Sequence, residues 1–292
     1  MIVQSLFARD MPASHDILRA SGIPVLASID HAVRAVSALQ RRGHRLATAT
    51  ERSSLELHTP PESASGGTRL LAEPAAREFI ESAGIEVGDW VFAATPAEAR
   101  AAVARFVVPC AVKAVSSQVV HKSDVGGVRL DVTDGESAFR SIVDSVRAAV
   151  SGADVMGVVV TPMAGRGIEL IVGATADPIF GPVVAFGSGG MLVEARGDVT
   201  FRAAPFTRLE AMEMIDETAA SKVLDGYRGL PKVDRERLAT FLVRVGDFAA
   251  STPRLRELDL NPVIANADGV LPLDVRIVLA EESSTRARKT SE

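Results

Sequence analysis

Basic side chains and a pair of glycines lie close together between residues 113 and 127 of this sequence. Lys113 stands within the apolar run Cys110–Val115, and His121, Lys122 and Gly126-Gly127 follow it. Lysine is almost never buried without a partner, so we expect an anionic group beside Lys113. Twin glycines let backbone N–H groups approach an anion closely. The segment predicts a polyphosphate-binding loop; the competing interpretation is a lysine reaching solvent from an edge strand, followed by a hairpin turn.

A second set of polar side chains lies on two apolar segments near the carboxyl end. Asp268-Gly269 separates these segments and predicts a two-residue hairpin turn. Such a turn places Asn261 opposite Arg276, and leaves Asn261 and Asp274 as diagonal neighbours on one face, about 7–8 Å apart. Mg²⁺ prefers oxygen ligands and commonly takes one or two from protein while phosphates and water supply the rest. The hairpin therefore predicts an Mg-nucleotide site, and the alternative is a solvated face with ordinary surface charges.

Length and composition indicate a soluble protein of one large or two modest domains. The chain has 292 residues, of which 47% are hydrophobic and 24% charged. A formal net charge of −5 argues against a general nucleic-acid surface. Cys110 is the single cysteine, which excludes an internal disulfide and favours a reducing cytoplasm. The amino terminus does not resemble a signal peptide, and no run of about 18 apolar residues is present to span a membrane, so we expect a cytoplasmic protein.

The order of helix and strand signals predicts an α/β or α+β domain after a linker. Residues 46–70 are rich in Ser, Thr, Pro and Gly and are expected to form the linker, whereas the strand at 23–26 and the helix at 30–39 are too little to fold alone. A helix is expected to begin at Glu73-Pro74, and Thr95, Thr133 and Thr207 each precede a glutamate at capping-box spacing. Residues 281–292 are polar and expected to be disordered. The expected strands are 90–93, 110–115, 127–132, 157–161, 168–173, 183–187 and 270–275.

Four stretches, 119–128, 177–184, 186–194 and 257–262, together resemble one family. The family is the ATP-grasp domain or beta-type subunit of nucleoside-diphosphate-forming (ADP-forming) acyl-CoA synthetases, in the succinyl-CoA synthetase-like superfamily. The resemblance covers 71–279 and implies an ATP-grasp fold, in which two α+β subdomains, about 71–160 and 161–280, sandwich a nucleotide. Residues 1–45 resemble the last strand and helix of the family's flavodoxin-like ligase domain, and are expected to be a remnant of it.

The resemblance also implies roles for individual residues. Lys113 matches a phosphate-contacting lysine, and Gly126 and Gly127 match the loop that covers the phosphates. His121 matches a second phosphohistidine carrier, and imidazole suits this role because its neutral nitrogen is nucleophilic near neutral pH. The remaining matches are the adenine-contacting hinge with Thr161 and Met163, the acidic Glu169 near the nucleotide, the magnesium-holding Asn261 and Asp274, and Glu194 in a glycine-rich segment where a mobile partner loop is expected to dock.

Plain structural interpretations remain open for three of these features. His121 can be a structural loop histidine, and the glycines before Glu194 can serve a simple strand-to-loop transition. Arg202 either binds phosphate or pairs with Asp198.

The family reaction interconverts acyl-CoA, phosphate and ADP with acid, CoA and ATP through a phosphohistidine. Lys113 and magnesium are expected to neutralise the phosphoryl oxygens in this transfer. The resemblance implies that a separate CoA-binding subunit supplies the missing half of the enzyme. Two alternatives remain: a non-catalytic ATP-binding regulatory protein, or an amide-forming ATP-grasp ligase that works through an acyl phosphate and does not require His121.

Overall fold

The computed structural model describes residues 3–4, 12–26, 28–47, 67–119, 121–190, 198–226, 229 and 231–281. The chain divides into two compact units, Met1–Glu56 and Leu57–Glu292. The smaller unit contains β1 (Val3–Gln4), α1 (Pro12–Ala20), β2 (Val25–Leu26) and α2 (Ile29–Ala47), and β1 pairs in parallel with β2. The division falls inside the segment expected to be a linker, most of which, like the tail 282–292, lies outside the described residues.

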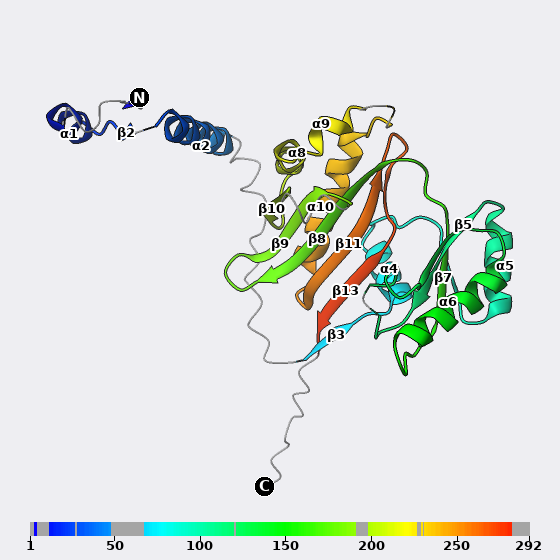
Figure 1. Ribbon diagram of the computed structural model, residues 1–292. Helices are drawn as coiled ribbons and strands as arrows, with labels where there is room; N and C mark the ends of the chain where they lie inside the picture. The colour runs from blue at the N-terminus through cyan, green and yellow to red at the C-terminus, as the bar shows by residue number, and fades with distance from the viewer. Residues whose placement is uncertain are drawn as a thin grey trace, which may run out of the picture. The chain divides into compact units, whose positions relative to one another are not determined.

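A large antiparallel sheet forms the base of the second unit (Figure 1). Its strand order is β10-β9-β8-β11-β13-β3, and β12 pairs with β11 beside this path. The strands are β3 (Thr68–Leu70), β8 (Ile168–Asp177), β9 (Gly181–Ser188), β10 (Val199–Ala203), β11 (Leu255–Ala265), β12 (Val270–Pro272) and β13 (Val275–Ala280). Along β11, buried residues such as Leu258 and Leu260 alternate with the more exposed Asp259 and Asn261. One face of this sheet is therefore apolar and the other polar.

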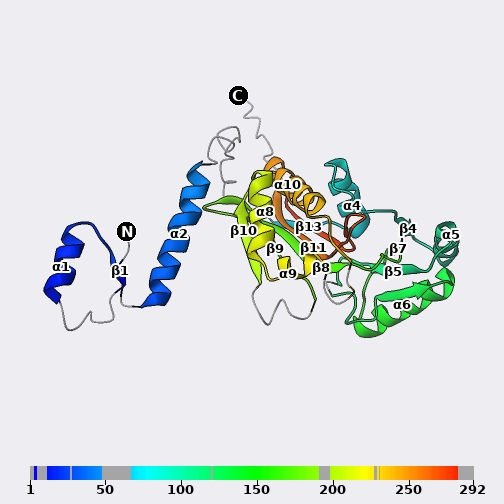
Figure 2. The ribbon, with the colours of Figure 1, turned by 90° about the horizontal axis from the view of Figure 1, so that it is seen from above.

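Helices cover the apolar face of the large sheet, as Figure 2 shows for α8 and α10. They are α4 (Glu73–Ser82), α8 (Arg208–Glu217), α9 (Ser221–Leu224) and α10 (Arg235–Ser251). Phe79 of α4 meets Phe248 of α10 edge to face, with ring centroids 5.2 Å apart. Burial of one Leu or Ile side chain in such a core stabilises the fold by about 1.5–3 kcal/mol. These helices do not cover the polar face of the large sheet.

A second, smaller antiparallel sheet has the order β4-β7-β5-β6. Its strands are β4 (Val91–Ala93), β5 (Cys110–Val115), β6 (Val128–Val132) and β7 (Gly157–Pro162), and it packs against α5 (Pro96–Phe106) and α6 (Gly135–Ala149). The chain passes from β7 directly into β8 of the large sheet. The two sheets with their helices confirm the α+β architecture expected from the sequence. No helix in the described part of the chain has the length and apolar character needed to cross a membrane.

Capping explains where several helices begin. Thr207 and Glu210 form a complete capping box at α8, and the Thr95 hydroxyl accepts from the Glu98 N–H at α5. The prediction for Thr133 is wrong, because Asp134 is the N-cap of α6 and accepts from two backbone N–H groups. A carboxylate next to the first turn is the better acceptor, since it also interacts favourably with the helix dipole.

The carboxyl-terminal hairpin differs from its prediction in turn and register. Four residues, 266–269, connect β11 to β12, and the Asn266 side chain accepts from the Asp268 and Gly269 N–H groups. Ala265 pairs with Val270, and Asp259 rather than Asn261 pairs with Arg276. The register has moved by two residues, so each side chain keeps its face. Continued through the irregular part of the pair, this register sets Asn261 opposite Asp274.

The expected single strand 270–275 is also interrupted. β12 ends at Pro272 and β13 begins at Val275, so Leu273 and Asp274 lie between two strands. The Leu273 N–H donates to the Pro262 carbonyl at 2.9 Å, while its own carbonyl accepts from side chains rather than from a sheet partner. The interruption frees this carbonyl for the site described below.

Cys110 gives a test of the small sheet. Its side chain is fully buried, and burial raises the pKa of the thiol, so the reactive thiolate is scarce at mildly alkaline pH. Alkylation by iodoacetamide, followed by mass spectrometry, is expected to be more than about tenfold slower in the native protein than in urea, and to speed up as pH rises. Equal rates in the two conditions would contradict the placement of Cys110 in β5.

Candidate functional site

Lys113 reaches across from the small sheet to the large one. It lies on β5 between β6 and β7, its side chain is buried, and its Nζ donates to the Leu273 carbonyl at 2.5 Å. Burial lowers the pKa of Lys113, and the nearby carboxylates of Glu73 and Asp274 partly oppose that effect. Lys113 is thus a desolvated cation whose acceptor is a neutral carbonyl, and among the described residues no carboxylate is bonded directly to it.

Lys122 lies in an ion cluster that joins the loop after β5 to both α4 and the large sheet. Its Nζ donates to Glu73 Oε2 at 2.5 Å and to Asp274 Oδ1 at 2.7 Å. Burial lowers the pKa of Lys122, but the two carboxylates outweigh burial and the pKa lies above its usual value. Lys122 therefore stays charged, and its two ion pairs hold it in a fixed position. The sequence indicated this lysine only as one basic residue of a loop.

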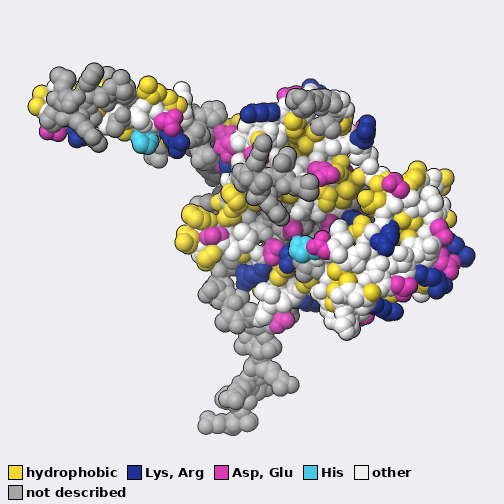
Figure 3. All heavy atoms as spheres, in the orientation of Figure 1, with side chains coloured by type: hydrophobic (Ala, Val, Ile, Leu, Met, Phe, Trp, Pro, Cys, Tyr) yellow, Lys and Arg dark blue, Asp and Glu magenta, His cyan; other side chains and the backbone are white. Residues whose placement is uncertain are grey.

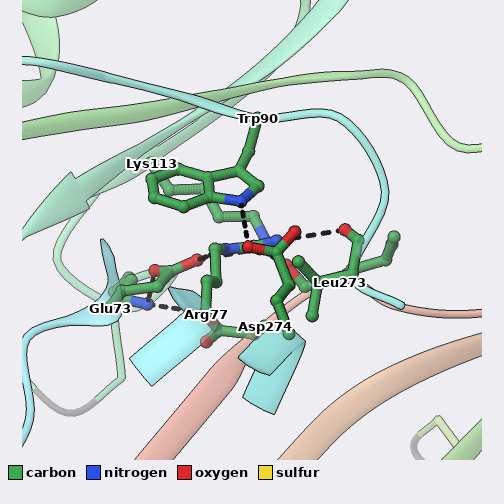
Figure 4. A network of polar contacts seen from close by, with 9 residues as sticks. Glu73, Arg77, Trp90, Lys113, Leu273 and Asp274 are labelled. Atoms are coloured by element: carbon green, nitrogen blue, oxygen red, sulfur yellow. Dashed lines mark hydrogen bonds and ion pairs between the residues drawn. The ribbon is translucent and has the colours of Figure 1, made fainter. Parts of the chain in front are cut away.

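A fully buried ion pair on α4 supports these lysines. Arg77 has no exposed surface, and its guanidinium donates to Glu73 Oε1 at 3.0 and 3.1 Å, to the Val87 carbonyl at 3.3 Å and to the Leu273 carbonyl at 2.6 Å. Figure 4 shows Arg77 and Lys113 converging on the segment that carries Leu273 and Asp274. The sequence indicated Glu73 only as a helix start and gave no role to Arg77.

The expected magnesium ligands fit a divalent cation. Burial raises the pKa of Asp274, but Lys122 and Lys113 lower it more, so the carboxylate stays ionised. The ammonium of Lys122 on Asp274 shows that this carboxylate already accommodates a cation. The observed register ends at Leu260–Val275, and its continuation by one residue sets the exposed Asn261, whose amide oxygen is a second candidate ligand, across from Asp274. These two residues suit magnesium bound together with phosphate oxygens.

The glycine pair does not present free amides, which corrects the prediction for Gly126 and Gly127. The Gly126 N–H donates to the Ser123 carbonyl at 3.2 Å, and the Gly127 N–H donates to the Lys122 carbonyl at 2.7 Å. Gly126 has a φ of 67°, and a Cβ on Gly127 would lie 2.9 Å from the Lys122 carbonyl oxygen. Glycine is needed here because the loop folds back tightly on itself and sets the position of Lys122.

A cavity of about 750 Å³ lies at the connection between the two sheets. Ala164 and Gly165 of the β7–β8 connection line it, and Met163 immediately precedes them. Thr161 pairs with Ala111 inside the small sheet, and the Met163 N–H donates to the Pro109 carbonyl at 3.0 Å. The hinge amide that was expected to meet adenine is therefore already bonded. One other wall is the segment that follows α4, which includes Val87 and Gly88. Another is the β11–β12 hairpin, which includes Ile264 and Leu271.

His121 and Asp259 lie near the polar face of the large sheet. Burial raises the pKa of Asp259, the neighbouring Glu257 raises it further, and Arg276 and His121 act in the opposite direction. His121 itself is exposed. Figure 3 shows acidic and basic side chains adjoining a histidine near the middle of the face drawn. Asp259 lies two residues before Asn261 on β11 and therefore on the same face of the sheet.

The remaining expected residues have different outcomes. Glu169 is exposed on β8 and pairs with Ile264 of the cavity wall, and its carbonyl accepts from the Gly189 N–H at 2.7 Å. Glu194 lies outside the described residues. Two alternatives were open for Arg202. Pairing with Asp198 is contradicted, because Arg202 pairs with Glu217 at 3.0 Å and Asp198 accepts from the Ala219 N–H.

Comparison with known proteins gives a consistent set of relatives. A family model described as an ATP-grasp domain matches residues 62–279. The ADP-forming acetate–CoA ligase I of Archaeoglobus fulgidus is 40% identical over 92% of this chain, which spans 41% of that protein's length. The beta subunit of the ADP-forming acetate–CoA ligase I of Pyrococcus furiosus is 40% identical over 75% of this chain and 95% of the subunit.

Solved structures agree with these relatives. The dinucleotide-forming acetyl-coenzyme A synthetase 1 of Ca. Korarchaeum cryptofilum, in complex with coenzyme A and Ca-AMPCP, superposes with a TM-score of 0.70 at 41% identity, covering 72% of this chain and 93% of the other. A complex of the same enzyme with coenzyme A and Mg-AMPPCP, whose phosphohistidine segment points towards the nucleotide-binding site, gives a TM-score of 0.61 at 36% identity, with 80% and 97% covered.

These matches define the class of protein. The chain has an ATP-grasp fold and belongs to the ATP-grasp domain family. Within that family it belongs with the beta-type subunits of ADP-forming acyl-CoA ligases, as the resemblance in its sequence indicated.

The ion cluster makes a prediction about lysine reactivity. Lys122 is paired with two carboxylates and its pKa is raised, so at pH 8 it is expected to be acetylated by acetic anhydride more than about tenfold more slowly than the exposed Lys222. The Asp274→Asn variant removes one carboxylate and is expected to speed labelling of Lys122 without changing Lys222. Peptide mass spectrometry measures both sites, and equally fast labelling of Lys122 and Lys222 in the unmodified protein would refute the cluster.

Proposed function

We propose that this chain is the nucleotide-binding part of an ADP-forming acyl-CoA synthetase, which interconverts acyl-CoA, phosphate and ADP with acid, CoA and ATP. The observation that carries the proposal is the approach of Lys113, Lys122 and Asp274 to one another at the junction of the two sheets. Lys113 is bonded to no carboxylate within the described part of the chain, which suits a phosphate group. Family membership with ADP-forming ligases supports the same conclusion.

The nucleotide is assigned to the junction between the sheets. We place its base in the cavity at the β7–β8 connection, against Ala164 and Gly165, since the Met163 N–H is already bonded. The segment 271–273 leads from the cavity wall to the carbonyl that holds Lys113, so a phosphate chain extending from the cavity meets Lys113 and then Lys122. Glu169 lies on the strand beside the cavity, where it can accept from ribose hydroxyls.

Asn261 and Asp274 are assigned as the protein ligands of Mg²⁺. When bound, the metal neutralises phosphate oxygens and so lowers the barrier to phosphoryl transfer. The chain's own part is to hold the amide oxygen of Asn261 on β11 and the ionised carboxylate of Asp274 on the connection between β12 and β13. Lys122 leaves Asp274 to contact the phosphates, because its ammonium and a metal ion compete for the same carboxylate oxygen.

His121 is assigned as a phosphoryl carrier. In the direction of ATP use, a neutral ring nitrogen attacks the γ-phosphorus, the N–P bond forms, and the bond to the ADP oxygen breaks with its electrons remaining on ADP. The reverse displacement regenerates ATP. Its exposure lets His121 receive or deliver the group at the edge of the cleft.

A CoA-binding partner completes the proposed reaction. The archaeal beta-subunit relative is one subunit of a larger enzyme, and the chain spans under half of the other relative. We propose that a separate subunit binds CoA and the acid, and that a phosphohistidine segment from it enters the cleft near Gly189-Gly190.

Replacement of Lys113 tests the phosphate contact. With the CoA-binding partner present, Lys113→Met is expected to lower kcat/KM for ADP by about 100-fold or more, because a charged hydrogen bond to phosphate is lost in the transition state. A coupled assay of ATP formation from acyl-CoA measures the change, and Lys222→Met on the exposed surface of α9 is the matched control. Unchanged turnover in Lys113→Met would remove the basis for the assignment.

Replacement of His121 tests the carrier. Incubation with γ-labelled ATP is expected to leave acid-labile, base-stable label on a peptide containing His121, and His121→Asn is expected to abolish that label while Mg-ADP still binds. Phosphopeptide mass spectrometry and calorimetry measure the two properties. Label that persists in the variant at the same level would assign the carrier to another residue, and loss of Mg-ADP binding would give His121 a binding role instead.

A further inference from the structure

We propose that the buried Glu73–Arg77 pair on α4 is a positioning device for the nucleotide site, which sets Lys113, Lys122 and Asp274 in register with the cavity. The inference rests on the proposed function. None of the pair's atoms is assigned to the reacting groups; both residues act through the residues that they hold. Figure 4 shows the network, in which α4 supplies Glu73 and Arg77, β5 supplies Lys113, and the connection between β12 and β13 supplies Leu273 and Asp274.

Arg77 joins two walls of the site. Its Nη1 donates to the carbonyl of Val87, which lines the cavity, and its Nη2 donates to the carbonyl of Leu273. Val87 and Leu273 are 186 positions apart in the sequence, so no local structure fixes their separation. A planar guanidinium presents its donors in a fixed fork, and it therefore holds the two carbonyls at one spacing.

The Leu273 carbonyl connects Arg77 to Lys113. Both cations donate to this one oxygen, at 2.6 Å from Arg77 and 2.5 Å from Lys113. The oxygen lies between β12 and β13, where no sheet ladder determines its direction. Arg77 holds this oxygen from α4. Arg77 therefore sets both the position of the Lys113 ammonium and the direction of the adjoining Asp274 side chain.

Glu73 positions Lys122 as Arg77 positions Lys113. Its Oε1 accepts from Arg77 and its Oε2 accepts from Lys122, and Lys122 also donates to Asp274. The Glu73 side chain is only 3% exposed. The cluster has three cations, Lys113, Lys122 and Arg77, and two carboxylates, Glu73 and Asp274. It therefore carries one net positive charge. Glu73 thus keeps two cations close together while the cluster as a whole still favours an anion.

The fold by itself does not need a charged pair at this position. Ala76 and Ile80 on the same helix already pack into the core, and replacing a buried ion pair with apolar groups is often neutral or stabilising. An exposed pair with the same i,i+4 spacing, Glu136–Arg140 on α6, also has a 3.0 Å contact but touches none of the site residues. The buried pair differs in that its hydrogen bonds to Val87, Leu273 and Lys122 lead to the site.

The test compares Glu73→Gln, Arg77→Lys and the double variant Glu73→Met/Arg77→Met in the full chain. Calorimetry with Mg-ADP measures affinity, thermal unfolding measures stability, and turnover with the partner subunit separates KM from kcat. Positioning predicts that Glu73→Gln weakens Mg-ADP binding by about 10- to 100-fold. Simple electrostatics predicts the opposite, since removal of a negative charge should strengthen binding of an anion.

The double variant separates positioning from packing. We expect it to unfold near the temperature of the unmodified protein yet to retain the weakened affinity for Mg-ADP. A double variant that is as stable as the unmodified protein and binds Mg-ADP within about twofold of its affinity would overturn the inference. If the double variant does not fold, Arg77→Lys decides: lysine keeps the charge but lacks the fork, and an unchanged KM for ADP in that variant would equally overturn the inference.

The controls keep this inference separate from the proposed function. Glu136→Gln and Arg140→Met are expected to leave affinity, KM and kcat unchanged. Failure of the unmodified chain to bind Mg-ADP would reject the nucleotide-binding function itself. Tight binding by the unmodified chain and equally tight binding by folded Glu73→Gln would reject only the positioning role.

Discussion

The hydrogen bond from Lys113 to the Leu273 carbonyl is the interaction on which the site depends. Lys113 belongs to the small sheet and Leu273 to the connection between two strands of the large sheet. The bond brings a buried cation of one sheet to the edge of the other, beside the carboxylate of Asp274. It is possible because the strand pairing stops at Pro272 and resumes at Val275, which leaves a carbonyl without a ladder partner.

Charge burial explains the arrangement around this bond. Isolated buried charges are costly, and each of the buried charged groups here is offset by a carbonyl or by an opposite charge. The compensation is incomplete at Lys113, whose pKa falls because burial outweighs its neighbours. A bound anionic ligand would supply negative charge beside Lys113 and so complete the compensation. Under the proposed function, the same cluster also favours polyphosphate, and competition between Lys122 and a metal ion for Asp274 connects the unliganded and the liganded site.

Sequence periodicity predicted part of this site and missed the rest for identifiable reasons. The sequence predicted Asn261 and Asp274 as diagonal neighbours on one face. The turn and the register were wrong, but a shift of two residues preserves the faces of a strand. The glycines were misjudged, since the sequence does not show that the carbonyls of Ser123 and Lys122 accept from their amides. Glu73 and Arg77 have ordinary helical spacing, and only contacts with residues far along the chain, such as Leu273, reveal their role. The strand Cys110–Val115 and its lysine were correctly predicted because the apolar run defines them locally.

Hydrogen–deuterium exchange of the full chain with and without saturating Mg-ADP measures the central claim most directly. The account predicts slower exchange at three segments together: 121–127 after β5, 161–165 at the connection between the sheets, and 271–276 between β12 and β13. It predicts no change on the outer face of α6. Protection confined to segments away from these three, with calorimetry showing that Mg-ADP is bound, would contradict a nucleotide site built around the Lys113–Leu273 contact.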